Sequence, residues 1–227
     1  MAIISTSYLP ARYLPLKMAS SSSKKSPGTN SCHFPLIYFL SLVAIIYTSF
    51  VAFAQTDMKK LIAYSSVAHM GFVTIGIFSR NLEGLQGSVF QMISHGLISA
   101  ALFLSAGFLI DRMKTKNIDN FGGLWNQMPM FSVFFMVYCL GAISFPGTTG
   151  FIGEFLILLG AFKINFLISF IAAFGVILSA CYVLWLYNRV CFGNNNFRGI
   201  SDLNTQDMLV FLIFLLLIVI LGIYPNF

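Results

Sequence analysis

Six long apolar segments constrain this chain more than any other feature. They cover residues 36–54, 60–78, 88–110, 130–163, 166–188 and 208–224. A helix needs about 20 apolar residues to cross the hydrocarbon core of a bilayer, and most of these segments approach that length. Apolar residues make up 58% of the chain and charged residues only 9%, which leaves no room for a sizeable soluble domain. The sequence therefore predicts an all-α integral membrane protein with about six transmembrane helices.

The fourth segment is too long for one straight span. Pro146 and Gly147 interrupt it, and Gly150 follows closely. Proline removes a backbone donor and clashes with the preceding turn, so it breaks a helix. We expect a discontinuous helix whose second half begins near Gly150. Transporters place such half-helices at their ion sites, where the broken backbone faces a protein-lined cavity.

Glu154 lies just after this break and is the only acidic residue between Asp119 and Asp202. A charged group at mid-bilayer costs roughly 2.5–3.5 kcal/mol on insertion scales, so a retained acid there indicates a functional site. The positive end of the second half-helix would also lie close to its carboxylate. Glu154 is therefore the first candidate site residue.

Two other segments each carry a polar stripe around one histidine. The stripe on the second segment comprises Ser65, Ser66 and His69, and the stripe on the third comprises Ser88, Gln91, His95 and Ser99. One interpretation is hydrogen bonding between helices, which is common for these residue types in membrane bundles. The other is a hydrated proton path, because histidine titrates near neutrality and exchanges protons at both ring nitrogens. Together with Glu154, the two histidines favour proton transfer.

Residues 1–35 differ in composition from the membrane region, residues 36–227. This N-terminal extension contains four basic residues, a serine run at residues 20–23 and no acidic residue. That composition is typical of an organelle transit peptide. The alternative is a disordered extension, since Pro10 and Pro15 interrupt any long amphipathic helix.

The net charge of +6 comes from basic residues that mostly flank apolar segments. This pattern indicates topology signals rather than nucleic-acid binding. The loops after the first, third and fifth segments contain Lys59, Lys60, Arg112, Lys114, Lys116, Arg189 and Arg198. Only Arg80 and Lys163 lie in the loops after the second and fourth segments. The positive-inside rule places the first group in the cytoplasm or the matrix.

Several enzyme classes are excluded by spacing. The glycines at 147, 150 and 153 do not form the dinucleotide-binding motif, and no strand precedes them. The three histidines lack metal-ligand spacing, and the four cysteines contain no C-x-x-C pair. We expect no cofactor, metal or redox centre in this chain.

Five collinear motifs carry a family resemblance. They are Gln55–Gly71 (QTDMKKLIAYSSVAHMG), Gln91–Gly96 (QMISHG), Gly122–Trp125 (GGLW), Phe145–Gly147 (FPG) and Gly150–Phe155 (GFIGEF). From about residue 36 to its end, the chain resembles the subunit 4 family of mitochondrial NADH:ubiquinone oxidoreductase, respiratory complex I.

The resemblance implies an antiporter-like fold with two inverted repeats of five helices, each with one broken helix. The first five segments would form the second repeat, and the sixth would be a following helix. Glu154 would match the buried glutamate of the second broken helix, and His69 and His95 the two intramembrane histidines. The implied function is proton translocation coupled to electron transfer from NADH to quinone, in the mitochondrial inner membrane. NADH, FMN, iron–sulfur clusters and ubiquinone would bind to other subunits, and the membrane-arm subunits would be the partners.

The chain also departs from the family pattern, because nothing in it corresponds to the first repeat. A separate chain that supplies this half is one expectation, and a non-functional fragment is the other. A third alternative is an Mrp-type sodium/proton antiporter subunit. Glu154 argues against it, since antiporter subunits typically have lysine at the matching position.

Overall fold

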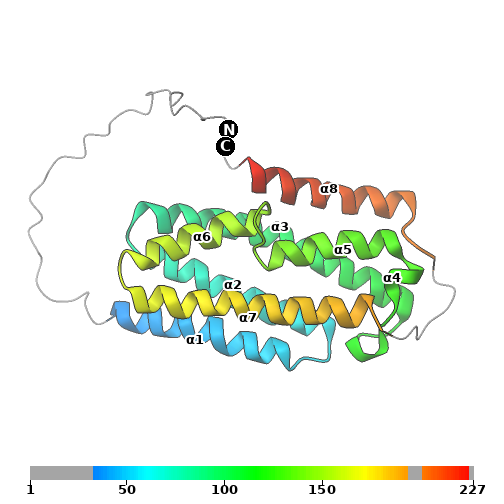
Figure 1. Cartoon of the computed structure of the whole chain (residues 1–227), viewed down its shortest axis with the longest axis horizontal. Coiled ribbons are helices and arrows are strands. Elements are labelled where there is room, and N and C mark those ends of the chain that lie inside the picture. The colour runs from blue at the N-terminus through cyan, green and yellow to red at the C-terminus, as the bar shows by residue number, and fades with distance from the viewer. Residues whose placement is uncertain (1–32, 194–200, 225–227) are drawn as a thin grey trace, which may run out of the picture.

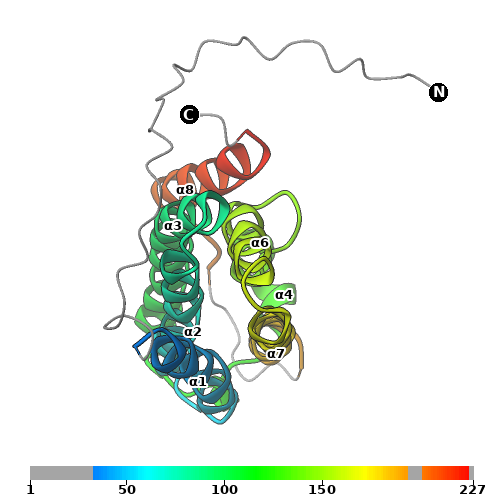
Figure 2. The same cartoon turned by 90° about the vertical axis from the view of Figure 1, so that its left-hand side faces the viewer.

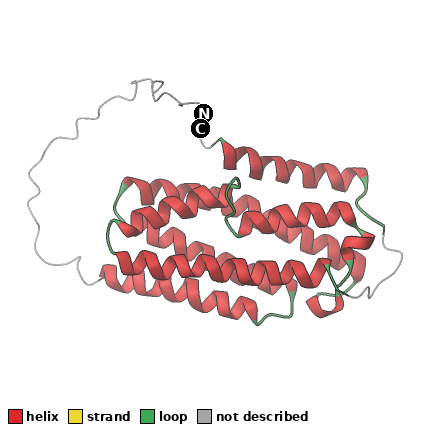
Figure 3. Cartoon of the chain, viewed as in Figure 1, coloured by secondary structure: helices red, strands yellow, loops and turns green. Residues whose placement is uncertain are grey.

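The structure is a computed structural model that describes residues 33–193 and 201–224, and these residues are helical without strands (Figure 3). The longer helices are α1 (His33–Phe53), α2 (Met58–Phe78), α3 (Leu82–Met113), α5 (Pro129–Ala142), α6 (Thr149–Phe162), α7 (Phe166–Cys191) and α8 (Thr205–Ile223). The sequence did not predict the short elements η1 (Ile118–Asn120) and α4 (Leu124–Gln127). Most of the N-terminal extension lies outside the described residues. The all-α prediction is confirmed.

Five of the described helices are long and apolar enough to cross a membrane. These are α1 from Pro35 onward, α2, α3, α7 and α8. The predicted fourth segment is divided into α5 and α6, which have 14 residues each. In Figure 1, α5 and α6 lie end to end beside the longer helices. The predicted set of about six spans, one of them discontinuous, is confirmed.

The break between α5 and α6 runs from Ile143 to Thr148 and contains Pro146. Ser144 and Gly147 both have positive φ angles, of 59° and 95°. Glycine adopts this left-handed conformation without steric cost, so residue 147 suits the turn. The helix α6 begins at Thr149, one residue before the predicted start.

The loops that follow α1 and α3 meet the end of α7 at one end of the bundle, which we call the Asp57 end. Asp57 caps α2 by accepting a hydrogen bond from the Lys59 backbone at 3.0 Å, and it forms an isolated antiparallel bridge with Asn117. Arg189 at the end of α7 forms an ion pair with Asp119 in η1. These contacts hold the ends of α1, α3 and α7 together.

The opposite end, which we call the Asn81 end, joins α3 to α6. The Asn81 side chain accepts a hydrogen bond from the Gly84 backbone at 2.8 Å and donates one to the Gly160 carbonyl at 2.7 Å. Lys163 and Glu83 form an exposed ion pair nearby. The start of α3 is therefore attached to the end of α6.

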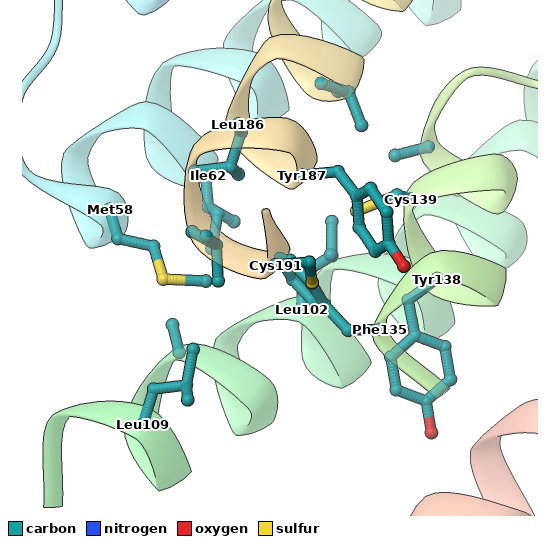
Figure 4. Close-up of a cluster of buried hydrophobic side chains, with 14 of the residues drawn as sticks. Met58, Ile62, Leu102, Leu109, Phe135, Tyr138, Cys139, Leu186, Tyr187 and Cys191 are labelled. Atoms are coloured by element: carbon teal, nitrogen blue, oxygen red, sulfur yellow. The ribbon is translucent and has the colours of Figure 1, made fainter. Parts of the chain in front are cut away.

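The larger hydrophobic core lies between α2, α3, α5 and α7, toward the Asp57 end (Figure 4). Figure 4 labels Met58, Ile62, Leu102, Leu109, Phe135, Tyr138, Cys139, Leu186, Tyr187 and Cys191 in this core. The Tyr138 hydroxyl donates a 2.6 Å hydrogen bond to the Phe211 carbonyl and so connects α5 to α8. This core fixes the helices that carry the polar site.

Glycines allow α3 and α6 to approach closely. A Cβ atom at Gly87 would lie 2.8 Å from the backbone nitrogen of Ile157. One at Gly153 would lie 2.3 Å from Gln91 Oε1 and 2.9 Å from Gln91 Cα. Real Cβ atoms do not approach neighbours this closely, so both positions require glycine. The close contact brings Gln91 of α3 beside the residue that precedes Glu154.

Candidate functional site

Glu154 is buried in the second turn of α6, with 2% of its surface exposed. Its Oε1 atom lies 2.8 Å from Nδ1 of His69, which projects from α2 and is 5% exposed. This distance is that of a close hydrogen bond. A carboxyl group and an imidazole thus share one buried contact, and both can gain or lose a proton.

Gln91 of α3 provides the second contact to the carboxylate. Its Nε2 atom donates to Glu154 Oε1 at 3.2 Å, and its side chain is almost fully buried. The close approach of α3 at Gly153 positions this amide. Three helices, α2, α3 and α6, therefore contribute to one polar cluster.

His95 continues the cluster on α3. Its ring centroid lies 5.4 Å from that of His69, with the two rings tilted by 39°. The two imidazoles line a cavity of about 10 Å³ together with Ser65, Ser66 and Ser99. A cavity of this size with several polar partners holds about one water molecule. The arrangement allows one water to connect the two histidines.

Several buried polar atoms of the cluster have no hydrogen-bond partner among the described residues. They include His69 Nε2, Gln91 Oε1 and Glu154 Oε2. A buried polar group without a partner costs about 1–3 kcal/mol. These atoms of the cluster can therefore bind water or exchange protons. The Ser65 and Ser66 hydroxyls, in contrast, already donate to the Ile62 carbonyl of their own helix.

The structure brings together most of the predicted site residues. Glu154, His69, His95, Gln91, Ser65, Ser66 and Ser99 all lie in or beside the cluster. Ser88 does not line the cavity, because its hydroxyl lies 3.0 Å from the Val73 carbonyl and 2.8 Å from the Gly84 carbonyl. It connects α3 to α2, as the hydrogen-bonding interpretation predicted for this residue type.

Sequence reasoning missed Tyr182 of α7. This side chain is fully buried, and its hydroxyl lies near Ser65 and close enough to Glu154 for electrostatic interaction. The Tyr182 hydroxyl forms no hydrogen bond with Ser65 or with any other described residue. A polar aromatic residue in the middle of an apolar span was the available signal.

The described residues contain no group of three or more histidine, cysteine or acidic side chains arranged to hold a metal ion. The chemistry that the cluster offers is proton exchange between carboxyl, imidazole and water.

Comparison with known proteins identifies the fold. The sequence family described as NADH:quinone oxidoreductase/Mrp antiporter, transmembrane region, matches residues 26–180. NADH-ubiquinone oxidoreductase chain 4 of Marchantia polymorpha is 55% identical over 195 residues, which are 85% of this chain and 39% of that protein. The chain thus spans about two fifths of the length of its curated relatives.

Solved structures of related membrane complexes contain chains with the same fold. A chain of respiratory complex I from Thermus thermophilus superposes with a TM-score of 0.81 at 33% identity, over 85% of this chain and 41% of that chain. The Mrp complex from Dietzia shares the fold, with a TM-score of 0.76 at 15% identity over 85% of this chain and 44% of that one. The predicted similarity to complex I subunit 4 and the antiporter-like fold are both confirmed. The chain belongs to the NADH:quinone oxidoreductase/Mrp antiporter transmembrane family.

Proposed function

We propose that this chain is part of a proton-translocating membrane-arm subunit of NADH:quinone oxidoreductase. The observation that carries the proposal is the buried 2.8 Å contact between His69 and Glu154, with His95 across a cavity the size of one water. A buried carboxyl–imidazole pair can move a proton between its two atoms without displacing either helix.

The pathway begins at Glu154 and continues through the two histidines. A proton on the Glu154 carboxyl group passes to Nδ1 of His69, which leaves a carboxylate beside an imidazolium. Gln91 stabilises this charged state, since its amide donates to the same carboxylate oxygen. The imidazolium then releases a proton toward His95 through the cavity that both rings line. Ser65, Ser66 and Ser99 supply the polar wall of that cavity.

The helix break serves the same pathway. Pro146 and Gly147 lie in the loop between the two half-helices, and Gly150 lies in the first turn of α6. The first backbone N–H groups of α6 point toward the break. The break therefore leaves polar backbone groups one turn away from Glu154.

The remaining parts of the enzyme belong to other chains. Electron transfer from NADH to quinone would take place in subunits that bind NADH, FMN, iron–sulfur clusters and ubiquinone, and this chain would bind none of them. Other membrane-arm subunits and lipid would surround it in the mitochondrial inner membrane.

Replacement of Glu154 tests the proposal. We expect Glu154→Gln to lower NADH-driven proton uptake in sealed vesicles that contain the assembled complex. Glu83→Gln is the matched control, because Glu83 is an acidic residue of α3 in an exposed ion pair with Lys163. Proton uptake that stays at the control level in the Glu154→Gln variant would count against proton translocation and favour a fragment without transport.

A sodium/proton antiporter is the alternative function. The likeness to the Mrp complex concerns the fold alone, since the identity is 15%. Sodium uptake into the same vesicles without NADH, driven by an imposed pH gradient, would favour the antiporter.

A further inference from the structure

A groove of about 360 Å³ opens between α3 and α8 near the Asp57 end of the bundle. Its apolar lining consists of Phe103, Leu104, Gly107, Phe108, Val210 and Phe211. The carboxylates of Asp111 and Asp207 also line it. The helix α8 lies at the edge of the bundle in both Figure 1 and Figure 2.

The apolar part of the groove is open to a neighbour. Leu104 and Val210 are 36% and 41% exposed. A Cβ atom at Gly107 would meet nothing within 4 Å, so the groove is hollow between its two walls. Only 17% of α8 is buried, the smallest share among the described spans. Small residues at such positions allow another helix to approach closely.

The charges around the groove do not balance. Arg112 forms an ion pair with Asp207 at 3.6 Å, packs over the Phe108 ring at 4.2 Å and donates to the Asp202 carbonyl at 3.0 Å. Asp111 has no ion pair among the described residues, and Lys114, three residues later, forms none with it. Of the two aspartates that line the groove, only Asp207 therefore has an ion-pair partner among the described residues.

This excess of negative charge lies at the end of the bundle where basic residues gather. Lys59, Lys60, Arg112, Lys114, Lys116 and Arg189 all lie in loops or helix turns at the Asp57 end. By the positive-inside rule, a neighbouring chain in the same membrane also places its lysines and arginines on that side. The chemistry that complements the groove is therefore an apolar helix with a basic residue at that level.

We infer that the groove between α3 and α8 receives a transmembrane helix of another protein chain, whose lysine or arginine pairs with Asp111. The apolar side of this helix packs on Leu104 and Val210 over the space at Gly107. The ion pair sets the depth and the direction of the helix, while packing supplies the contact area. This interface does not depend on proton translocation.

Photo-crosslinking in the native membrane tests the inference. A benzophenone amino acid is placed at Leu104 in the full chain, and one at Phe170 on the exposed surface of α7 serves as the control. We expect residue 104 to crosslink to a membrane helix with a lysine or arginine at the Asp57 end, as located by peptide mass spectrometry. Residue 170 should crosslink mainly to lipid.

Charge reversal at Asp111 provides the second readout. Asp111→Lys should lower the crosslinking yield at residue 104 about fivefold, the change expected when an ion pair at the upper end of the exposed range is lost. Asp57→Asn is the matched control, because asparagine also caps α2, and it should leave the yield unchanged. Crosslinks to phospholipid, to a second copy of this chain or to a helix without a basic residue at that level would overturn the inference. An unchanged yield in Asp111→Lys would do the same.

Discussion

Glu154 Oε1 and His69 Nδ1 lie 2.8 Å apart although 85 residues separate them in the chain. The contact joins the second half of a broken helix to an unbroken one. Because both side chains are almost fully buried, we expect the coupling free energy of this contact to exceed that of an ion pair on the surface.

A double-mutant cycle measures that difference. We expect His69→Ala and Glu154→Gln to show a coupling free energy of about 1–3 kcal/mol, as is usual for buried residues in direct contact. The cycle between Lys163 and Glu83, an exposed pair, should give about 0.2–1 kcal/mol. Denaturant titration of the single and double variants in mixed micelles supplies both numbers. Equal coupling in the two cycles would contradict the tight contact between His69 and Glu154.

Gly153→Ala should disturb the contact between α3 and α6. The added Cβ would lie 2.9 Å from Gln91 Cα, and overpacking of this kind costs typically about 1–3 kcal/mol of unfolding free energy. Gly96→Ala is the control on α3, because a Cβ there meets nothing within 4 Å. It should be neutral, or stabilising by up to about 1 kcal/mol through helix propensity. Thermal unfolding of both variants in the same detergent compares them.

Ser66→Val should reduce proton transfer between His69 and His95. Valine removes a hydroxyl group from the wall of the small cavity and fills part of a space large enough for about one water. We expect the rate of proton uptake in sealed vesicles to fall at least about tenfold. Loss of a group that itself transfers the proton would lower the rate by roughly 10²–10⁴-fold, whereas Ser66 only lines the cavity. Ser105→Ala, which removes a buried hydroxyl of α3 that bonds to Ala101, should pump normally. Normal uptake in Ser66→Val would mean that this cavity is not on the pathway.

Asn81→Ala should destabilise the protein more than Asn165→Ala. Both residues cap a helix, Asn81 at α3 and Asn165 at α7. Asn81 also donates a hydrogen bond to the Gly160 carbonyl of α6. Loss of the cap costs about 1 kcal/mol and loss of the second bond about as much again, so we expect about 2 and 1 kcal/mol for the two variants. Urea unfolding would reveal the order, and the reverse order would mean that α3 is not attached to α6 at this point.

Hydropathy predicted the helices well and their ends less well. The third span was predicted over residues 88–110, whereas α3 covers Leu82–Met113. Glu83, Asp111 and Arg112 lie inside the helix but outside the apolar run, because helix ends reach the polar edge of the membrane. The Asn81 cap explains where α3 begins, and caps depend on local geometry rather than on apolar periodicity.

The residues of the site could be predicted, but their contacts could not. Charge inside an apolar segment identified Glu154, and polar stripes identified His69 and His95. No local pattern indicates that α6 packs against α3 and α2, so the sequence could not show that Gln91 donates to Glu154. Tyr182 was missed for the same reason, since its role depends on the position of α7 in the bundle.

The 32 residues of α3 give it a length of about 48 Å at 1.5 Å per residue, so it runs from one end of the bundle to the other. Its start is attached to α6 through Asn81 and Gly160, its middle carries Gln91 and His95, and its far end carries Asp111. Because these residues share one continuous helix, the contact that attaches the start of α3 to α6 also fixes the axial position of Gln91, 3.2 Å from Glu154.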